Sequence, residues 1–425
     1  MSRARYLPAM VLTVALFFLW GMANNLNDIL IAQFRRAFTL SDFETSFVQQ
    51  AFYLGYFCLA MPAAMVVRAH GYKAAILIGL LLYAAGALLF YPAAHYGEYR
   101  YFLAALFVIA SGLAFLETSA NPLMTELGDP EGGARRLNWA QAANPLGTLT
   151  GVLIGKYFIF SQIAHDDKAL ATMAPAARAS FNRVEVQAVQ IPYLVIGLVV
   201  LGFAIAAAMI RFPARSGTVE ASAGKLRLSA VVREPTLVFA VVAQFFYVGA
   251  QVGLWSYTIR YAQANVPGMI ERSAADYLFA SLVLFGIGRL VGSSLMTRIA
   301  PARLLAGFAA ASAGLAVVAA LAGGMTGLLL LVAASFFMSI QFPTIFALGI
   351  ERLGPLRQTG AALLVMAIIG GAAISAAIGA VSDRAGISAA MLVPAVAFLV
   401  VLAFALRSVR AGSIGAPAMV LDRGA

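Results

Sequence analysis

The chain is poor in charged residues, which make up only 11% of its 425 residues, against about 25% in an ordinary soluble domain. It has a single cysteine, Cys58, so an internal disulfide is excluded, and we expect this apolar-run cysteine to be a small core residue. The three histidines, His70, His95 and His165, show no metal-ligand spacing, and no G-x-x-x-x-G-K-[ST] phosphate loop is present. We therefore expect neither an enzyme nor an ATP-driven pump, and neither a cofactor nor a metal.

Apolar residues are abundant instead, at 62% of the chain. A helix needs about 20 apolar residues to cross a hydrocarbon core about 30 Å thick. The runs in this sequence predict an all-α polytopic membrane protein. We place twelve spans, at roughly 7–32, 44–67, 74–94, 101–125, 137–160, 191–211, 236–262, 276–297, 303–323, 326–349, 360–381 and 388–406.

The net charge of +11 is distributed unevenly between the connecting segments. With the N-terminus inside, the inner segments hold eighteen Lys and Arg residues and the outer segments hold ten. Cytoplasmic segments of membrane proteins carry such an excess. The basic balance therefore indicates a topology with both termini cytoplasmic, and it does not indicate nucleic-acid binding.

The spans fall into two groups of six that resemble each other weakly. Pro122 precedes Gly128 by six residues in the fourth span, and Pro343 precedes Gly349 by six in the tenth. Parallel repeats of this kind are typical of the major facilitator fold, in which the two halves are related by an axis along the membrane normal. We predict two six-helix pseudo-repeats joined by a cytoplasmic linker, at 1–212, 213–235 and 236–425.

Polar residues interrupt the first span in a regular pattern. Trp20, Asn24 and Asp28 are four residues apart, and Asn25 precedes Asp28 by three. Side chains at these spacings share one helix face. An ionised group at bilayer depth costs about 2.5–3.5 kcal/mol on insertion scales. The stripe therefore indicates a water- or substrate-filled cavity, with Asp28 as its first candidate residue.

Two further spans of the first half carry buried polar residues at helical spacing. Glu117 and Asn121 are four apart in the fourth span, and Gln141 and Asn144 are three apart in the fifth. The amides could also form a polar network that only fixes helix packing, and for Asn24 both readings stay open. Two carboxylates are an expensive way to fix packing, so Asp28 and Glu117 are candidates for carrying a proton.

The second half contributes aromatic and amide side chains. Gln251, Phe285 and Phe342 would suit stacking on, and hydrogen bonding to, a neutral polyol such as a sugar, although such rings also occur in ordinary packing. Arg289 alone among the Lys and Arg residues lies mid-span, and an arginine at that depth should meet a carboxylate, helix carbonyls or substrate. We expect it to line the interface between the halves.

Several motifs together resemble the L-fucose:proton symporters, a sugar branch of the major facilitator superfamily, over nearly the whole chain. The segments that carry the resemblance are Phe17 to Asp28, Ala51 to Phe57, Gly112 to Pro122, Arg136 to Gly147, Tyr247 to Tyr257 and Ser339 to Thr344. The resemblance implies uptake of a sugar across the bacterial inner membrane, driven by inward proton flow through alternating access. We expect a monomer in the lipid bilayer whose other partners are the sugar and protons.

The resemblance also implies roles for individual residues. Asp28 falls on the proton carrier, and Glu117 on the acid implicated in substrate binding and coupling. The cavity residues of the family fall on Asn25, Gln141, Asn144 and, as an aromatic wall, Phe285.

One position departs from the family pattern, because Phe342 stands where we expect a tyrosine. The ring can still stack on a sugar, but one hydroxyl hydrogen bond is lost. L-fucose is the first expectation, and glucose, galactose or an amino sugar is the alternative. A proton antiporter that exports a small molecule, or a non-transporting sugar sensor, ranks below both.

Overall fold

The computed structural model of the protein describes residues 7–40, 42–127, 132–159, 174–212 and 233–414. At a few positions within these ranges, among them Asp28, only the backbone is described. Every regular element in the described ranges is a helix, as the apolar runs predict. Residues 213–232 of the predicted linker, and His165, lie outside the described residues.

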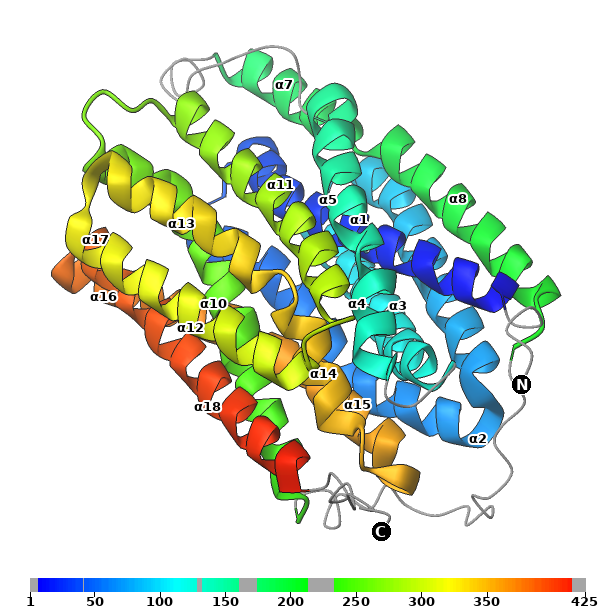
Figure 1. The fold of residues 1–425 in the computed structure, drawn as a ribbon. Coiled ribbons are helices and arrows are strands. Elements are labelled where there is room, and N and C mark those ends of the chain that lie inside the picture. The colour runs from blue at the N-terminus through cyan, green and yellow to red at the C-terminus, as the bar shows by residue number, and fades with distance from the viewer. Residues whose placement is uncertain (1–6, 41, 128–131, 160–173, 213–232, 415–425) are drawn as a thin grey trace, which may run out of the picture.

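The described helices fall into two sets along the chain (Figure 1). The first set is α1 (Leu7–Phe38), α2 (Asp42–Tyr96), α3 (Tyr99–Glu126), α4 (Gly133–Gln141), α5 (Ala143–Ile154), the π-helical η3 (Gly155–Ile159), α7 (Pro175–Gln187) and α8 (Gln190–Met209). The second set is α10 (Pro235–Asn265), α11 (Glu271–Leu295), α12 (Pro301–Ala322), α13 (Gly324–Met338), α14 (Gln341–Ile350), η4 (Gly354–Leu356), α15 (Arg357–Met366), η5 (Ala367–Ile369), α16 (Gly370–Ala385), α17 (Ile387–Ala390) and α18 (Leu392–Ile414).

Ten helical stretches among the described residues are long and apolar enough to cross a membrane. The predicted second and third spans follow each other directly in one stretch, Phe47–Tyr96, in which the non-helical backbone at Gly71 (φ 84°, ψ 173°) separates two helices. The predicted fifth span, 137–160, is divided among α4, α5 and η3, none of which is long enough alone. Dividing α2 at Gly71 and joining these three pieces recovers the twelve predicted spans.

Large apolar side chains cover the outer faces of the helices. Ile191, Met209 and Leu321 are 71%, 81% and 78% exposed. In a water-soluble protein such surfaces would mark an interface or an aggregation risk. On helices of spanning length the lipid bilayer covers them.

Cys58 is exposed, so the prediction that it is a core residue is wrong. It lies on α2 near Leu54 and Phe57, which are 49% and 40% exposed. An apolar helix in a membrane can turn one face to the protein and another to lipid. Because both faces are apolar, composition alone does not tell them apart.

Several helix pairs approach so closely that no side chain fits between their backbones, and two of them show the shortest approach. A Cβ atom at Gly147 on α5 would overlap the carbonyl oxygen of Phe18 on α1. A Cβ atom at Gly370 on α16 would likewise overlap the carbonyl oxygen of Phe245 on α10. Small residues permit such approach, and in lipid the resulting van der Waals contact is a main source of helix association.

The remaining helices pack largely within the two sets. α2 lies along α3 and α8, while α10 and α12 both lie along α18. In Figure 1, α8 and α18 are found on opposite sides of the bundle. The two sets meet where α11, α14 and α15 contact α2, α3, α4 and α5.

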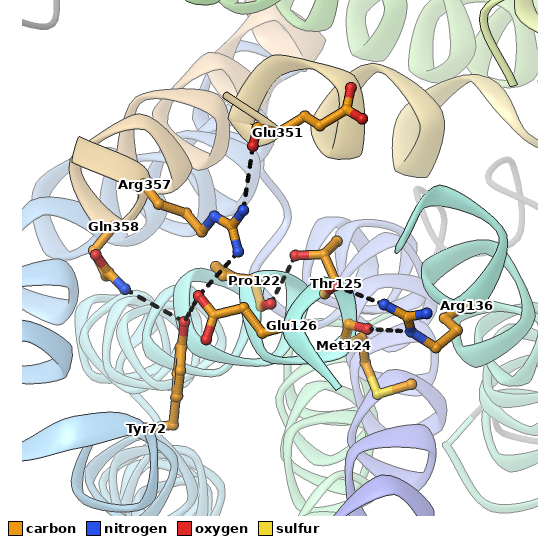
Figure 2. Close-up of polar contacts among 9 residues, drawn as sticks. All are labelled: Tyr72, Pro122, Met124, Thr125, Glu126, Arg136, Glu351, Arg357 and Gln358. Atoms are coloured by element: carbon orange, nitrogen blue, oxygen red, sulfur yellow. Dashed lines mark hydrogen bonds and ion pairs between the residues drawn. The ribbon is translucent and has the colours of Figure 1, made fainter. Parts of the chain in front are cut away.

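An ion pair joins the sets between the C-terminal end of α3 and the start of α15. Arg357 on α15 lies 3.2 Å from the Glu126 carboxylate on α3. Tyr72 donates a hydrogen bond of 2.8 Å to the same carboxylate, and Gln358 donates to the Tyr72 hydroxyl at 3.4 Å (Figure 2). Partly exposed pairs are worth about 0–1 kcal/mol each, so this cluster can break without large cost.

Substitution of Gly147 tests the close contact between α1 and α5. We expect Gly147→Ala to destabilise the protein by about 1–3 kcal/mol, because an inserted methyl group forces the two backbones apart. Gly202→Ala on α8 is the matched control, since nothing lies within 4 Å of a Cβ atom built there. Thermal unfolding of the detergent-solubilised variants measures the difference. Equal melting temperatures for the two would contradict the close packing.

Candidate functional site

Aromatic rings from four helices meet near the middle of the bundle. The Trp20 indole on α1 donates a 2.6 Å hydrogen bond to the Tyr56 hydroxyl on α2. Its ring centroid lies 5.8 Å from that of Phe342 on α14, and the Tyr247 ring on α10 lies 6.5 Å from Phe342 on the other side. Phe342 is only 5% exposed. Trp20 of the first set and Phe342 of the second, both predicted cavity residues, therefore lie next to each other.

The Glu117 carboxyl group lies beside this cluster on α3, in a stretch whose residues are all buried. The residue is 2% exposed, and neither carboxyl oxygen has a hydrogen-bond partner. Its charge lies within electrostatic range of the Tyr56 hydroxyl. A buried charge without a partner is costly. The position therefore suits a carboxyl group that takes up and releases a proton.

Arg289 on α11 joins the two helix sets. Its Nε donates to the Ser339 carbonyl at 2.7 Å, and its Nη1 donates to the Gln141 carbonyl at 3.0 Å. The two carbonyls lie at the junctions of α13 with α14 and of α4 with α5. Each is four residues before a proline, Pro343 or Pro145, so its own helix offers it no N–H. The guanidinium also lies 4.7 Å from the centroid of the Phe285 ring. The sequence analysis predicted a carboxylate, helix carbonyls or substrate as the partner of Arg289. Among the described residues, its partners include helix carbonyls.

The predicted amide side chains differ in burial and in their hydrogen-bond partners. Gln141 is fully buried and donates a 2.9 Å hydrogen bond to the Asn121 side-chain oxygen. Asn144 is half-buried and donates weakly, at 3.4 Å, to the Phe17 carbonyl. Asn25 is half-buried, with a side-chain oxygen that is covered and has no partner. Unpaired amide groups of this kind can bind a hydroxylated ligand.

Four other predicted residues lie on α1, α10 and α11. Asn24 on α1 and Gln251 on α10 are half-buried. Phe285 packs edge-on against Trp255, with centroids 5.0 Å apart. The backbone of Asp28 continues α1 one turn beyond Asn24, but its side chain lies outside the described residues.

The sequence-based site missed three polar side chains that the fold brings to this region. Tyr56 pairs with Trp20, and Asn138 on α4 donates a 3.1 Å hydrogen bond to the Thr344 hydroxyl on α14. Gln244 on α10 is fully buried, and neither atom of its amide has a partner. The cluster of aromatic residues around Tyr56 in the sequence could have indicated that Tyr56 belongs to the site. No sequence pattern near Asn138 indicates that it pairs with Thr344. Among the described residues, no group of three or more His, Cys, Asp or Glu side chains could hold a metal ion.

Comparison with known protein families supports the architecture. The sequence model of the Major Facilitator Superfamily matches residues 10–377. The chain is 44% identical over 410 residues to the L-fucose-proton symporter of Escherichia coli (strain K12), covering 95% of this chain and 93% of the relative. It is 34% identical over 413 residues to a glucose/galactose transporter of Brucella abortus, covering 95% of each.

Solved structures agree with these sequence relatives. A crystal structure of the E. coli fucose:proton symporter superposes with a TM-score of 0.87 at 43% identity, covering 95% of this chain and 99% of that one. A proton:xylose symporter superposes with a TM-score of 0.70 at 13% identity, covering 96% of each chain, which speaks for the fold alone. The chain therefore belongs to the major facilitator superfamily, in the branch that contains the L-fucose-proton symporters.

Proposed function

We propose that this protein takes up a sugar together with a proton by alternating access, and that L-fucose is its first candidate substrate. The similarity at 44% identity to a relative named an L-fucose-proton symporter supports this choice of sugar. The observation that carries the proposal is the buried Glu117, whose carboxyl oxygens have no partner and which lies within electrostatic range of Tyr56, the hydrogen-bond partner of Trp20.

The chemistry of the site suits a sugar. Trp20 and Phe342 would stack on the apolar face of the ring, and Asn25, Gln141 and Asn144 would bind its hydroxyl groups. Gln251 and Phe285 would complete the wall on the side of α10 and α11. Amides can both donate and accept hydrogen bonds, as a sugar hydroxyl can, so the two match without a net charge.

The transport cycle follows from placing the acids between two moving halves, residues 1–212 and 236–425, joined by a cytoplasmic linker at 213–235. Asp28 takes a proton from the periplasm, and sugar binds beside Glu117. The neutral acid no longer opposes closure around an apolar seal, so the halves rock inward around the central site. The pair of Glu126 and Arg357 would close the cytoplasmic end during the outward-open stage. In this assignment both termini are cytoplasmic and the monomer in the inner membrane is the transporting unit.

A second candidate substrate is another hexose. Phe342 has no hydroxyl group to offer a sugar, and the Brucella relative, at 34% identity, is named a glucose/galactose transporter. The discriminating experiment adds L-fucose, D-galactose and D-glucose one at a time to weakly buffered, de-energised cells that express the protein. Alkalinisation of the medium with one of them identifies both the symport and the sugar. Acidification would instead indicate an antiporter, and no change with any sugar would contradict proton-coupled uptake of these hexoses.

Replacing the proton carrier should separate binding from coupling. We expect Asp28→Asn, which mimics the protonated acid, to abolish pH-driven sugar accumulation while leaving sugar exchange in proteoliposomes. Asp28→Glu is the matched control, because it keeps a titratable group. Sugar accumulation against a gradient in Asp28→Asn would remove Asp28 as the proton carrier.

Arg289 should be indispensable because its two carbonyl partners belong to different helix sets. We expect Arg289→Ala to lose transport at a normal level of protein in the membrane. Arg289→Lys keeps the charge but not the planar set of donors, so it should recover only a small part of the rate. Initial rates of radiolabelled sugar uptake, normalised to immunoblots of the membrane fraction, measure both. Unaltered transport in Arg289→Ala would show that the bridge is dispensable.

A further inference from the structure

Two buried amide side chains connect Arg289 to the neighbourhood of Glu117. Arg289 donates from Nη1 to Gln141 Oε1 at 3.4 Å, in addition to the Gln141 backbone carbonyl. Gln141 in turn donates from Nε2 to Asn121 Oδ1 at 2.9 Å. The Asn121 Nδ2 has no partner, although Asn121 is fully buried. The series therefore ends in a free donor inside the protein.

The free donor lies one helical turn from two free acceptors. Glu117 precedes Asn121 by four residues on α3, so the two side chains share a face of the helix. Both Glu117 carboxyl oxygens are buried without a partner. Asn121 Nδ2 can therefore donate a hydrogen bond to a Glu117 carboxyl oxygen when either side chain rotates.

The direction of the series is fixed by Arg289. A guanidinium can only donate hydrogen bonds, so Gln141 must present its oxygen to Arg289. Its nitrogen is then the group that faces Asn121, which must accept through Oδ1. This leaves the Asn121 N–H groups, and not its oxygen, for Glu117. The amide dipoles consequently run head to tail from a cation to a carboxylate.

We propose that Gln141 and Asn121 form an amide relay that couples Arg289 to Glu117, so that the contact between α11 and the α4–α5 break depends on the charge of Glu117. The proposal rests on the proposed function, in which Glu117 changes its charge during transport. Asn121 acts in it as a positioning residue, through its two neighbours.

The relay responds to charge for a physical reason. Hydrogen bonds to an ionised carboxylate are roughly twice as strong as those between neutral groups, and hydrogen bonds in a chain polarise one another. An ionised Glu117 therefore holds Asn121, Gln141 and Arg289 in place and keeps the helix sets together at this point. A protonated Glu117 weakens the last hydrogen bond, and the contact between the sets loosens.

Other titratable groups near the relay can be named. Tyr56 on α2 lies within electrostatic range of Glu117, and Tyr247 on α10 lies within range of Arg289. Both are phenols with ordinary pKa values near 10, so their charge does not change in the physiological range. Among the described side chains, Glu117 is therefore the group whose change of charge would alter the hydrogen bonds of the relay.

The test measures the distance across the contact without any sugar. Spin labels at Leu146→Cys on α5 and Leu290→Cys on α11, in a Cys58→Ser background, flank the contact on exposed positions. In the parent we expect the distance distribution to shift between acidic and alkaline buffer. In Asn121→Leu, which keeps the volume but removes the amide, we expect that shift to be lost.

Matched variants separate the relay from general damage to α3. Ser119→Ala is the control, because Ser119 is equally buried and donates only to the Phe115 and Leu116 carbonyls of its own helix. It should keep the shift of the parent. Gln141→Leu should lose the shift, as Asn121→Leu does. If Asn121→Leu does not fold, Gln141→Leu takes its place in the test.

Two results would overturn the relay: a parent that shows no pH-dependent shift, or a shift that survives in both Asn121→Leu and Gln141→Leu. Combining Asn121→Leu with Glu117→Gln should add nothing to the effect of Glu117→Gln alone, because both break the same coupling. An additional change in the double variant would also count against the relay. Failure of the proposed symport is recognised separately, by the absence of sugar-induced pH changes in cells.

Discussion

The satisfaction of two backbone carbonyls inside the membrane is the constraint on which the centre of this protein depends. In a bilayer no water binds a backbone carbonyl, so protein groups must satisfy it. The Gln141 and Ser339 carbonyls each lie four residues before a proline, Pro145 and Pro343, which has no N–H to donate to them. The Arg289 guanidinium donates to both carbonyls, so a single side chain stabilises two helix interruptions and places them against each other.

This arrangement explains why the site is assembled from unlike halves. The first helix set supplies the carboxyl group of Glu117 and the amides, and the second supplies Phe342, Tyr247 and Arg289. An acid that has no direct ion pair among the described residues can change its protonation state without breaking one. Aromatic rings on the opposing side exclude water, which strengthens every polar interaction that remains.

The close glycine contacts serve a different need from the central site. Gly147 and Gly370 hold α1 against α5 and α10 against α16 through backbone contact alone. Such contacts make each helix pair rigid, because packed backbones have few alternative positions. The contacts between the sets include side-chain pairs that can separate, such as the hydrogen bond of Asn138 with Thr344 and the ion pair of Glu126 with Arg357, beside the ring contact of Trp20 with Phe342. Rigid units joined by breakable contacts are what alternating access requires.

Much of this could be predicted from the sequence, because the relevant signals are local. Hydropathy determined the spans, and helical spacing placed Glu117 and Asn121 on one face of one helix. Arg289 lies deep within an apolar run, so the sequence already indicated that its guanidinium needs hydrogen-bond acceptors inside the protein. These conclusions depend only on the membrane as a solvent and on the geometry of a single helix.

The tertiary structure alone decided which groups meet. Gln141 pairs with a residue 20 positions away, Arg289 with one 148 positions away, and Arg357 with one 231 positions away. No local pattern sets the register between helices that are distant in sequence, since that register comes from the packing of all of them together. The same reason explains Cys58, because an apolar residue is compatible with both core and lipid until the neighbouring helices are in place.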